Sequence, residues 1–248
     1  MCYPASFVVT RKKVFWSKFT DSHEEIIREF NLKDTDVRGE ATFVCAEMTP
    51  PNKDWNAPLK DWNYTLQDIK PSWYDEGGVE QTTRKSLKEW YDTKVVPAGT
   101  VRKRITATDA HMYVLGTVKI VNGGTVQCVY DGGTVQSVHN GGIVQRVHNG
   151  GTVQRVYDGG IVQCVYDGGT VQRVHNGGTV QIVDDGTVQI VNGGIVQKIY
   201  SGTVQKIYSG TVQTYTKLPL EILKGNSAVL INRSDGVKCY TGKAGKSN

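Results

Sequence analysis

Between Gly116 and Gly210, hydrophobic and polar positions recur every eight or nine residues. Twelve copies follow the consensus Gly-Thr/Ile-Val-Gln-x-Val/Ile-Tyr/His-Asp/Asn-Gly, spaced by eight residues, then six nines, then four eights. Position three is always Val, and position four is Gln in every copy except the first, where Lys119 replaces it. A unit this short cannot bury its apolar positions alone. The pattern therefore predicts a stack of neighbouring units that share one core.

Two β architectures fit this unit: an antiparallel meander, and a parallel β-solenoid in which each repeat is half a coil. Asp-Gly and Asn-Gly pairs are strong hairpin turns and favour the meander. In a straight strand, however, apolar residues at positions three and six would point to opposite faces. A solenoid strand that bends near positions four and five turns both inward, and the double Gly then makes the corner, where a positive φ is required. Near-identity between copies also suits stacking of like on like, so the solenoid is favoured.

If each repeat is half a coil, the twelve repeats form about six coils, and residues at the same position of every second repeat stack in a column. Positions three, four and six form the repeated scaffold, with the Gln side chains as amide ladders; examples are Val126, Gln127, Val129, Val135, Gln136 and Val138. Position seven places Tyr130, His148 and Tyr166 on one side, and His139, Tyr157 and His175 on the other. Position five stacks Arg155 with Arg173 on one side, and Cys128, Arg146 and Cys164 on the other. The rings at position seven are expected to stack along the solenoid, or to form a strip that faces a ligand.

The flanking segments complete a mainly β protein with small terminal parts. Residues 1–100 predict an α+β head domain, with a hairpin over Ser6–Thr10 and Lys13–Ser17, strands over Thr42–Met48 and Trp62–Ile69, and helices from Ser22 and over Val79–Val96. Residues 101–115 are expected to be a linker and N-terminal cap, and 116–215 the solenoid. Residues 216–248 are expected to be a C-terminal cap whose hairpin turns at Asp235-Gly236.

Two resemblances rest on particular stretches of the chain. The stretch "GGTVQRVYDGG" resembles the passenger repeats of AIDA-type bacterial autotransporters, whose coils carry similar units between Gly-Gly corners. The layout of a short head, a solenoid of near-identical repeats and a small cap resembles uncharacterised bacteriophage proteins. The residues that carry this second resemblance are "CYPASFVVT", "VFWSKFTDSHEEII", "PSWYDE" and "LKEW". It implies an origin and a layout, not a chemistry.

Composition narrows the class of protein. The net charge is +5, and its excess lies in residues 216–248, which hold six Lys/Arg and two Asp/Glu. The five cysteines form no CxxC pair, which is typical of a reduced chain. No apolar run is long enough for a signal peptide or a membrane span. We therefore expect a cytoplasmic protein, in a bacterial host if it is phage-encoded, with no membrane contact.

Candidate binding residues fall into an aromatic set and a basic set. All five tryptophans lie in the head, where they predict a small core or, alternatively, a binding groove around Trp55, Trp62, Trp73 and Tyr74. The basic candidates for phosphate contacts are Arg102, Lys103 and Arg104 in the linker, and Arg146, Arg155 and Arg173 in the solenoid.

One catalytic hypothesis concerns Cys2. If Met1 were removed, Cys2 would become an N-terminal nucleophile with its own α-amine as the base. The sequence supplies no oxyanion or base partners for it, and it contains no phosphate-loop, HExxH, GxSxG or paired-cysteine zinc motif. No cofactor and no metal site are predicted.

The leading hypothesis is therefore a non-catalytic binding or scaffold protein, a phage or bacterial accessory factor that recognises a host protein through its head or a solenoid face. Three alternatives stay open: a nucleic-acid-binding protein, a small N-terminal-nucleophile hydrolase, and a component of a surface or virion fibre. A homo-oligomer is compatible with each of them.

Overall fold

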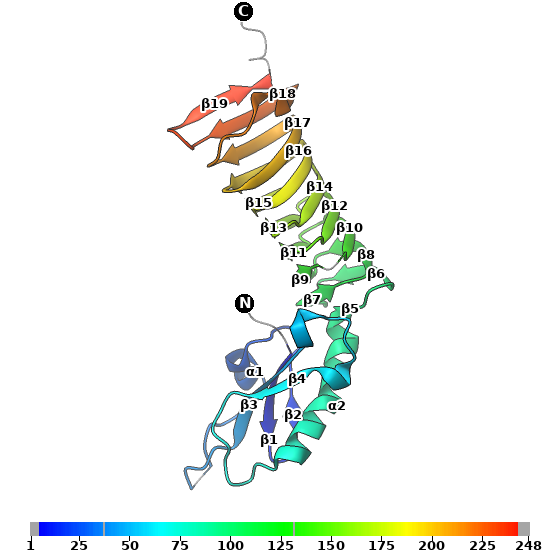
Figure 1. The fold of residues 1–248 in the computed structure, drawn as a ribbon, viewed down its shortest axis with the longest axis vertical. Helices are drawn as coiled ribbons and strands as arrows, with labels where there is room; N and C mark the ends of the chain where they lie inside the picture. Colours follow the sequence, from blue (N-terminus) through cyan, green and yellow to red (C-terminus); the bar gives the residue numbers. More distant parts are fainter. Residues whose placement is uncertain (1–4, 37, 131, 243–248) are drawn as a thin grey trace, which may run out of the picture. The chain divides into compact units, whose positions relative to one another are not determined.

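The computed structural model describes residues 5–36, 38–130 and 132–242. The chain divides into two compact units, residues 1–95 and 96–248, here called the head and the solenoid unit. Figure 1 shows the elements of both units. Each unit is described by itself.

The head is an antiparallel sheet of four strands with two α-helices. Its strands lie in the order β2-β1-β3-β4. Its elements are β1 (Ser6–Thr10), β2 (Val14–Phe15), α1 (His23–Glu29), β3 (Phe43–Thr49), two short 3₁₀ turns (Pro51–Lys53 and Leu59–Asp61), β4 (Asn63–Leu66) and α2 (Glu76–Lys94). Both helices begin at a side-chain cap, because Ser22 accepts from the amide of Glu25 and Asp75 accepts from the amide of Gly78. The α+β interpretation of this region is confirmed.

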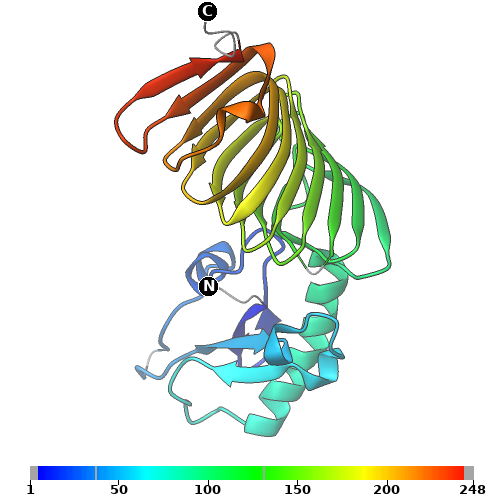
Figure 2. The same ribbon diagram turned by 45° about the horizontal axis from the view of Figure 1, so that its top comes forward.

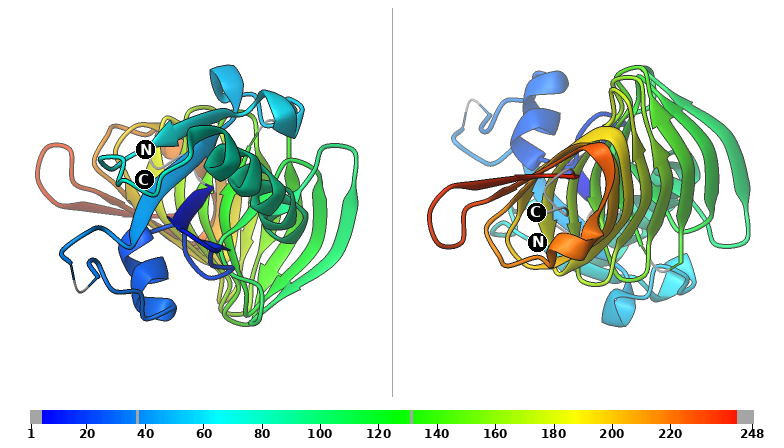
Figure 3. Two further views of the ribbon diagram at one scale, coloured as in Figure 1. Left: turned by 90° about the horizontal axis from the view of Figure 1, so that it is seen from below. Right: turned by 90° about the horizontal axis from the view of Figure 1, so that it is seen from above.

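The solenoid unit is a 15-stranded sheet that winds through about eight turns. Its strands are β5 (Val95–Val96), where one unit ends and the other begins, then β6 (Val101–Thr106), β7 (Met112–Val114), β8 (Thr117–Asn122), β9 (Thr125–Val129), β10 (Thr134–His139), β11 (Ile143–Val147), β12 (Thr152–Val156), β13 (Ile161–Tyr166), β14 (Thr170–His175), β15 (Thr179–Asp184), β16 (Gly186–Ile199), β17 (Gly202–Thr214), β18 (Leu223–Asn232) and β19 (Lys238–Thr241), with a 3₁₀ turn at Leu220–Ile222. Figure 2 shows the strands side by side along the stack, and Figure 3 looks along it, with successive coils lying one behind another.

Parallel pairing between alternate repeats confirms the half-coil solenoid. Thr134 pairs with Thr152, two nine-residue repeats later, and Ile143 pairs with Ile161 in the same way on the other side. The ladder joins positions two, three, five and six, so position four falls at the bend between them. Val at positions three and six is fully buried in coil after coil, as in Val135 and Val138. The bend thus turns both apolar positions inward.

The repeat glutamines differ from the expectation of an amide ladder. They are half-buried or exposed, and the buried Oε1 of Gln127 has no hydrogen-bond partner. Within the described residues, no hydrogen bond joins two of these amides. Main-chain bonds hold the register instead, such as the one from the amide of Thr152 to the carbonyl of Gly133, at 2.9 Å.

The corners use their two glycines for different reasons. At the corner after β10, Asn140 (φ 51°) and Gly141 (φ 75°) both have positive φ, and the amide of Gly142 donates to the carbonyl of His139 at 2.9 Å. This is a type I′ turn, the geometry that Asn-Gly favours. Gly142 is needed for space, because a Cβ on it would lie 2.5 Å from the carbonyl oxygen of Val121 in the coil below. Positive φ falls on Asn/Asp and the first Gly at the corners after β10, β11, β12 and β13, but on the first Gly alone at Asn122-Gly123 and Asn176-Gly177; at no described corner does it fall on both glycines.

The corners change where the repeats shorten from nine to eight residues. From Gly186 onward the strand continues through the corner, so that β16 and β17 each contribute to both sides of the solenoid. Each of these corners keeps one residue with positive φ, such as Gly193 (φ 96°) or Gly202 (φ 96°). The register shifts where His175 meets Asn192 and Gly193, which is the first such step on that side.

Segments on both sides of the repeat array extend the solenoid beyond the six coils of the repeat. Residues 101–115, expected to be a linker and cap, supply β6 and β7, which pair in parallel with β8 and β9. At the other end β18 continues the parallel stack, with Leu230 fully buried, and β19 folds back on it as an antiparallel hairpin. The predicted turn lies at Asp235-Gly236, where Gly236 has φ 94°.

Candidate functional site

The two sides of the solenoid carry different chemistry. We call the surface of β6, β8, β10, β12, β14 and the first halves of β16 and β17 the basic face, and that of β7, β9, β11, β13, β15 and the second halves of β16 and β17 the opposite face. The strands of the basic face hold seven cationic residues and no Asp or Glu: Arg102, Lys103, Arg104, Lys119, Arg155, Arg173 and Lys206. The opposite face holds Arg146, Lys198 and one acid, Asp184. The repeat array as a whole is therefore nearly neutral, but one of its two sides is strongly cationic.

The core of the basic face is the position-five column. Register places Ser137, Arg155 and Arg173 on consecutive strands, followed by Ile190 and Lys206. Arg155 and Arg173 are exposed, as is Lys206. Adjacent strands lie about 4.8 Å apart, and the Debye length at physiological salt is about 8 Å, so the fields of neighbouring cations add.

The basic candidates 102–104 join this face through β6. Arg104 pairs with Ile120 in the ladder, which aligns it with the position-five column. Lys103 and Arg104 are exposed, whereas Arg102 is tied back to Asp109, with a guanidinium nitrogen 2.6 Å from the carboxylate. The segment is therefore part of a rigid sheet, and two of its three cations point their charge to solvent.

The position-seven columns stack as predicted. On the opposite face His148 lies 5.1 Å from Tyr130 and 5.0 Å from Tyr166, centroid to centroid. On the basic face His139 and Tyr157 are parallel, with centroids 5.4 Å apart and planes 3° apart. The next step differs, because His175 is turned 80° from Tyr157 and its centroid is 6.0 Å away.

A hollow opens on the basic face at this break in the column. Its volume is about 490 Å³, and it is lined by Arg155, Tyr157, Asp158, His175, Asn176, Asn192 and Ser209. Burial first, then the nearby charges of Arg173 and Arg155, lower the pKa of His175. A neutral imidazole, two amides and a tyrosine thus stand beside exposed guanidinium groups.

The opposite face has a smaller hollow of the contrary character. It measures about 230 Å³, and Asp167, Asp184 and Asp185 are among its lining residues. A cluster of carboxylates repels an anion, so the surroundings of the two hollows differ in charge.

The aromatic candidates of the head separate into core and surface. Trp55 and Trp62 are 3% and 1% exposed, and their rings meet edge to face at 5.6 Å. These two are core residues, because the small sheet needs large side chains to fill it, and the predicted groove does not include them. Trp73 and Tyr74 are half-buried; the indole N–H of Trp73 donates to the carbonyl of Ala41 at 2.6 Å, and the hydroxyl of Tyr74 bonds that of Tyr64 at 3.0 Å.

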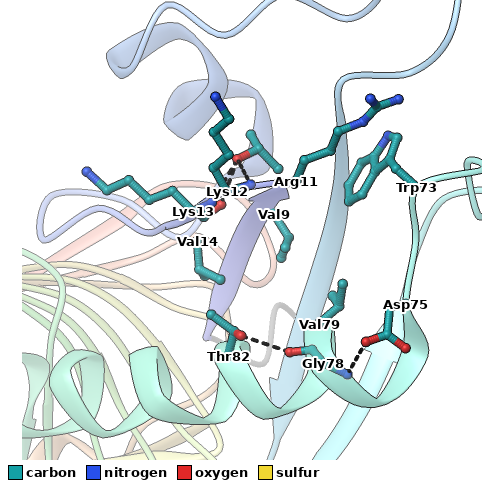
Figure 4. Close-up of a pocket in the computed structure, with 11 residues that line it drawn as sticks. Val9, Arg11, Lys12, Lys13, Val14, Trp73, Asp75, Gly78, Val79 and Thr82 are labelled. Atoms are coloured by element: carbon teal, nitrogen blue, oxygen red, sulfur yellow. Dashed lines mark hydrogen bonds between the residues drawn. The ribbon is translucent and has the colours of Figure 1, made fainter.

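The head also has a shallow groove of about 250 Å³ beside the β1–β2 turn, with Trp73 and the start of α2 on its walls. Figure 4 shows Arg11, Lys12 and Lys13 fanning away from one another. Arg11 pairs with Glu40 at 2.6 Å, and Lys13 lies over the ring of Phe15. The carboxylate of Asp75 already caps the helix at this groove. Because the cations diverge, the groove offers no converging anion site.

The structure adds little to the catalytic hypothesis. Cys2 lies outside the described residues. In the head, burial and the carboxylate of Asp68 raise the pKa of Cys45 to about 12, so this thiol is not a thiolate near neutral pH. In the described parts of the chain, no three His, Cys, Asp or Glu side chains are arranged to hold a metal ion. No helix there is long and apolar enough to cross a membrane.

Reasoning from the sequence found Arg155 and Arg173 but missed the face they belong to. The net charge of the whole repeat array is close to zero, and this sum does not show that the cations lie mostly on one face. The signal is present in alternate repeats: reading every second copy collects Lys119, Arg155, Arg173 and Lys206 on one side.

Comparison of the chain with protein-family models, with curated proteins and with solved structures found no match.

Proposed function

We propose that the protein acts by binding, and that it holds a polyanionic macromolecule along the basic face of its solenoid. The observation that carries this proposal is the separation of charge between the two faces. Seven cationic residues and no acids lie on the strands of one side, whereas two cationic residues and one acid lie on those of the other.

The rigidity of the ladder supports this function. Main-chain hydrogen bonds and a continuous Val core hold each position-five side chain at a fixed height along the stack. A preformed array orders little on binding, which saves conformational entropy. Arg155 and Arg173 lie on adjacent strands, about 4.8 Å apart and so within one Debye length, and together they attract a polyanion more strongly than a single charged group.

A matched pair of double variants tests the proposal. Arg155→Ser/Arg173→Ser removes two charges from the basic face, and Arg146→Ser/Lys198→Ser removes two from the opposite face. All four positions are position five of the repeat, and Ser137 shows that the column accommodates serine. The two proteins have the same net charge, so any difference between them reports the face.

The measurement is retention on immobilised heparin, eluted with a salt gradient. We expect the first variant to elute at clearly lower salt than the wild type, and the second to elute close to the wild type. Equal elution of both variants would contradict the proposal, since retention would then follow net charge alone.

A further inference from the structure

We propose that the polyanion is a single-stranded nucleic acid, and that the hollow beside Tyr157 is a subsite for one of its unstacked bases. This inference rests on the proposed function, because it names the partner of the same face. It starts from the break in the ring column, where the parallel stacking of His139 on Tyr157 gives way to the perpendicular His175.

The hollow lies where the ring column ends and the repeat shortens. From β10 to β14, every repeat on this side is nine residues long and ends in a two-residue turn. In the next coil the repeat is eight residues long, and Asn192 stands where the following ring would continue the column. A small amide side chain in place of a ring leaves space against the neighbouring Tyr157 and His175, and the hollow occupies this place.

The lining suits a nucleobase. Tyr157 and His175 are partly exposed; His139 already covers one face of the Tyr157 ring, so a base can stack only on ring surface that turns toward the hollow, and any base suits it because every base has a π-face. Asn176 and Asn192 can each donate and accept hydrogen bonds, and the carboxylate of Asp158 can accept from an exocyclic amine. Arg155, on the rim, can contact a phosphate next to the bound base.

Asp158 favours a nucleic acid over an acidic protein as the partner. A glutamate or aspartate side chain in the hollow would meet the carboxylate of Asp158, and like charges repel at this range. A neutral base meets no such penalty, while its phosphates stay over the arginines. A single strand is favoured over a duplex because bases that are paired and stacked cannot enter a hollow.

The test is binding of a fluorescein-labelled twelve-nucleotide mixed-sequence DNA, single-stranded or as a duplex, followed by fluorescence anisotropy at fixed salt. We expect the wild type to bind the single strand about tenfold more tightly than the duplex. Tyr157→Ala should lose most of that preference, whereas Tyr157→Phe should keep it. Tyr166→Ala is the matched control, since Tyr166 occupies the same repeat position on the opposite face.

The outcomes distinguish the inference from the proposed function. If single strand and duplex bind equally, or if Tyr157→Ala binds like the wild type, the base subsite is wrong, although loss of binding in Arg155→Ser/Arg173→Ser would still support the basic face. If poly-glutamate binds and neither DNA does, the partner is an acidic protein and the inference is overturned. If no polyanion binds at all, both proposals fail. Circular dichroism confirms that each variant is folded.

Discussion

The ammonium group of Lys94 lies 2.7 Å from the carboxylate of Asp21, at a position where the Lys94 side chain is fully buried in the head. It also donates to the carbonyls of Ser17 and Thr20, both at 3.1 Å. Three acceptors thus converge on one buried cation and join the end of α2 to the chain before α1. Burial is the larger influence on the pKa of Lys94, which is lowered, and the Asp21 carboxylate opposes that shift.

Lys94→Met should destabilise the head, because it removes the buried cation that pairs with the Asp21 carboxylate and donates to two carbonyls, although Asp21 still accepts from the indole N–H of Trp90 at 3.2 Å. Removing one partner of a buried pair typically costs about 3–5 kcal/mol. Lys88→Met is the control, since Lys88 and Asp92 form an exposed pair on the same helix and are expected to contribute less than about 1 kcal/mol. Urea unfolding of the two variants measures the difference, and equal midpoints would contradict a structural role for Lys94.

Alanine substitutions at the two glycines of one corner should destabilise the protein by different amounts. Gly168→Ala places a Cβ in open space at a positive φ of 77°, which costs about 1–2 kcal/mol. Gly169→Ala places a Cβ 2.1 Å from the carbonyl oxygen of Val147, so the coils must separate, and a loss above about 3 kcal/mol is expected. Guanidinium unfolding compares the neighbours directly. A larger loss at Gly168 would show that conformation, not space, governs this corner.

Stability should fall in mild acid because of His148. Its burial, reinforced by the positive charge of Arg146, lowers the pKa of His148 in the folded protein. The unfolded chain then binds more protons than the folded one as the pH drops below about 6.5, and stability is lost until the lowered pKa is reached. His148→Tyr places in this column the residue found on both neighbouring coils, at Tyr130 and Tyr166. We expect the variant to lose less stability than the wild type between pH 7.5 and 5, measured by urea unfolding; an unchanged difference would assign the acid sensitivity elsewhere.

Removal of residues 142–159, one full coil, should leave a folded protein. The deletion joins Gly141 to Gly160, which restores a consensus corner, and every remaining residue keeps its side of the solenoid. We expect cooperative unfolding with a smaller denaturant dependence, since less surface is exposed. A broad, non-cooperative transition would mean that coils are not interchangeable units.

The periodic part of the chain was predictable because one rule governs it. A bend near positions four and five, the ring columns and the Arg155–Arg173 stack follow from a two-repeat coil, and each is confirmed by the register or the ring geometry. The coil at Val101–Thr106 was not predicted, because "VRKRIT" has no Val-Gln signature and shares only the apolar positions of a strand. The roles of Trp55 and Trp62 depend on long-range packing, which no local pattern encodes. The hollow beside Tyr157 lies where Asn192 follows His175 in the column, and its shape depends on packing between coils that no single repeat encodes.

Because each coil contains two repeats, the side on which a repeat lies depends on whether an even or an odd number of repeats precedes it. Gain or loss of two repeats lengthens or shortens both sides without exchanging them. Gain or loss of one repeat moves every later repeat to the other side of the solenoid. Without residues 142–150, for instance, Arg155 and Arg173 would move to the side opposite Lys119, and the cationic array would be divided while the fold kept its corners and its core. Slippage by a single unit during replication of such a gene would therefore divide the surface that we propose binds a polyanion, and a second slip would reunite it, with no change in the codons of the remaining cationic residues.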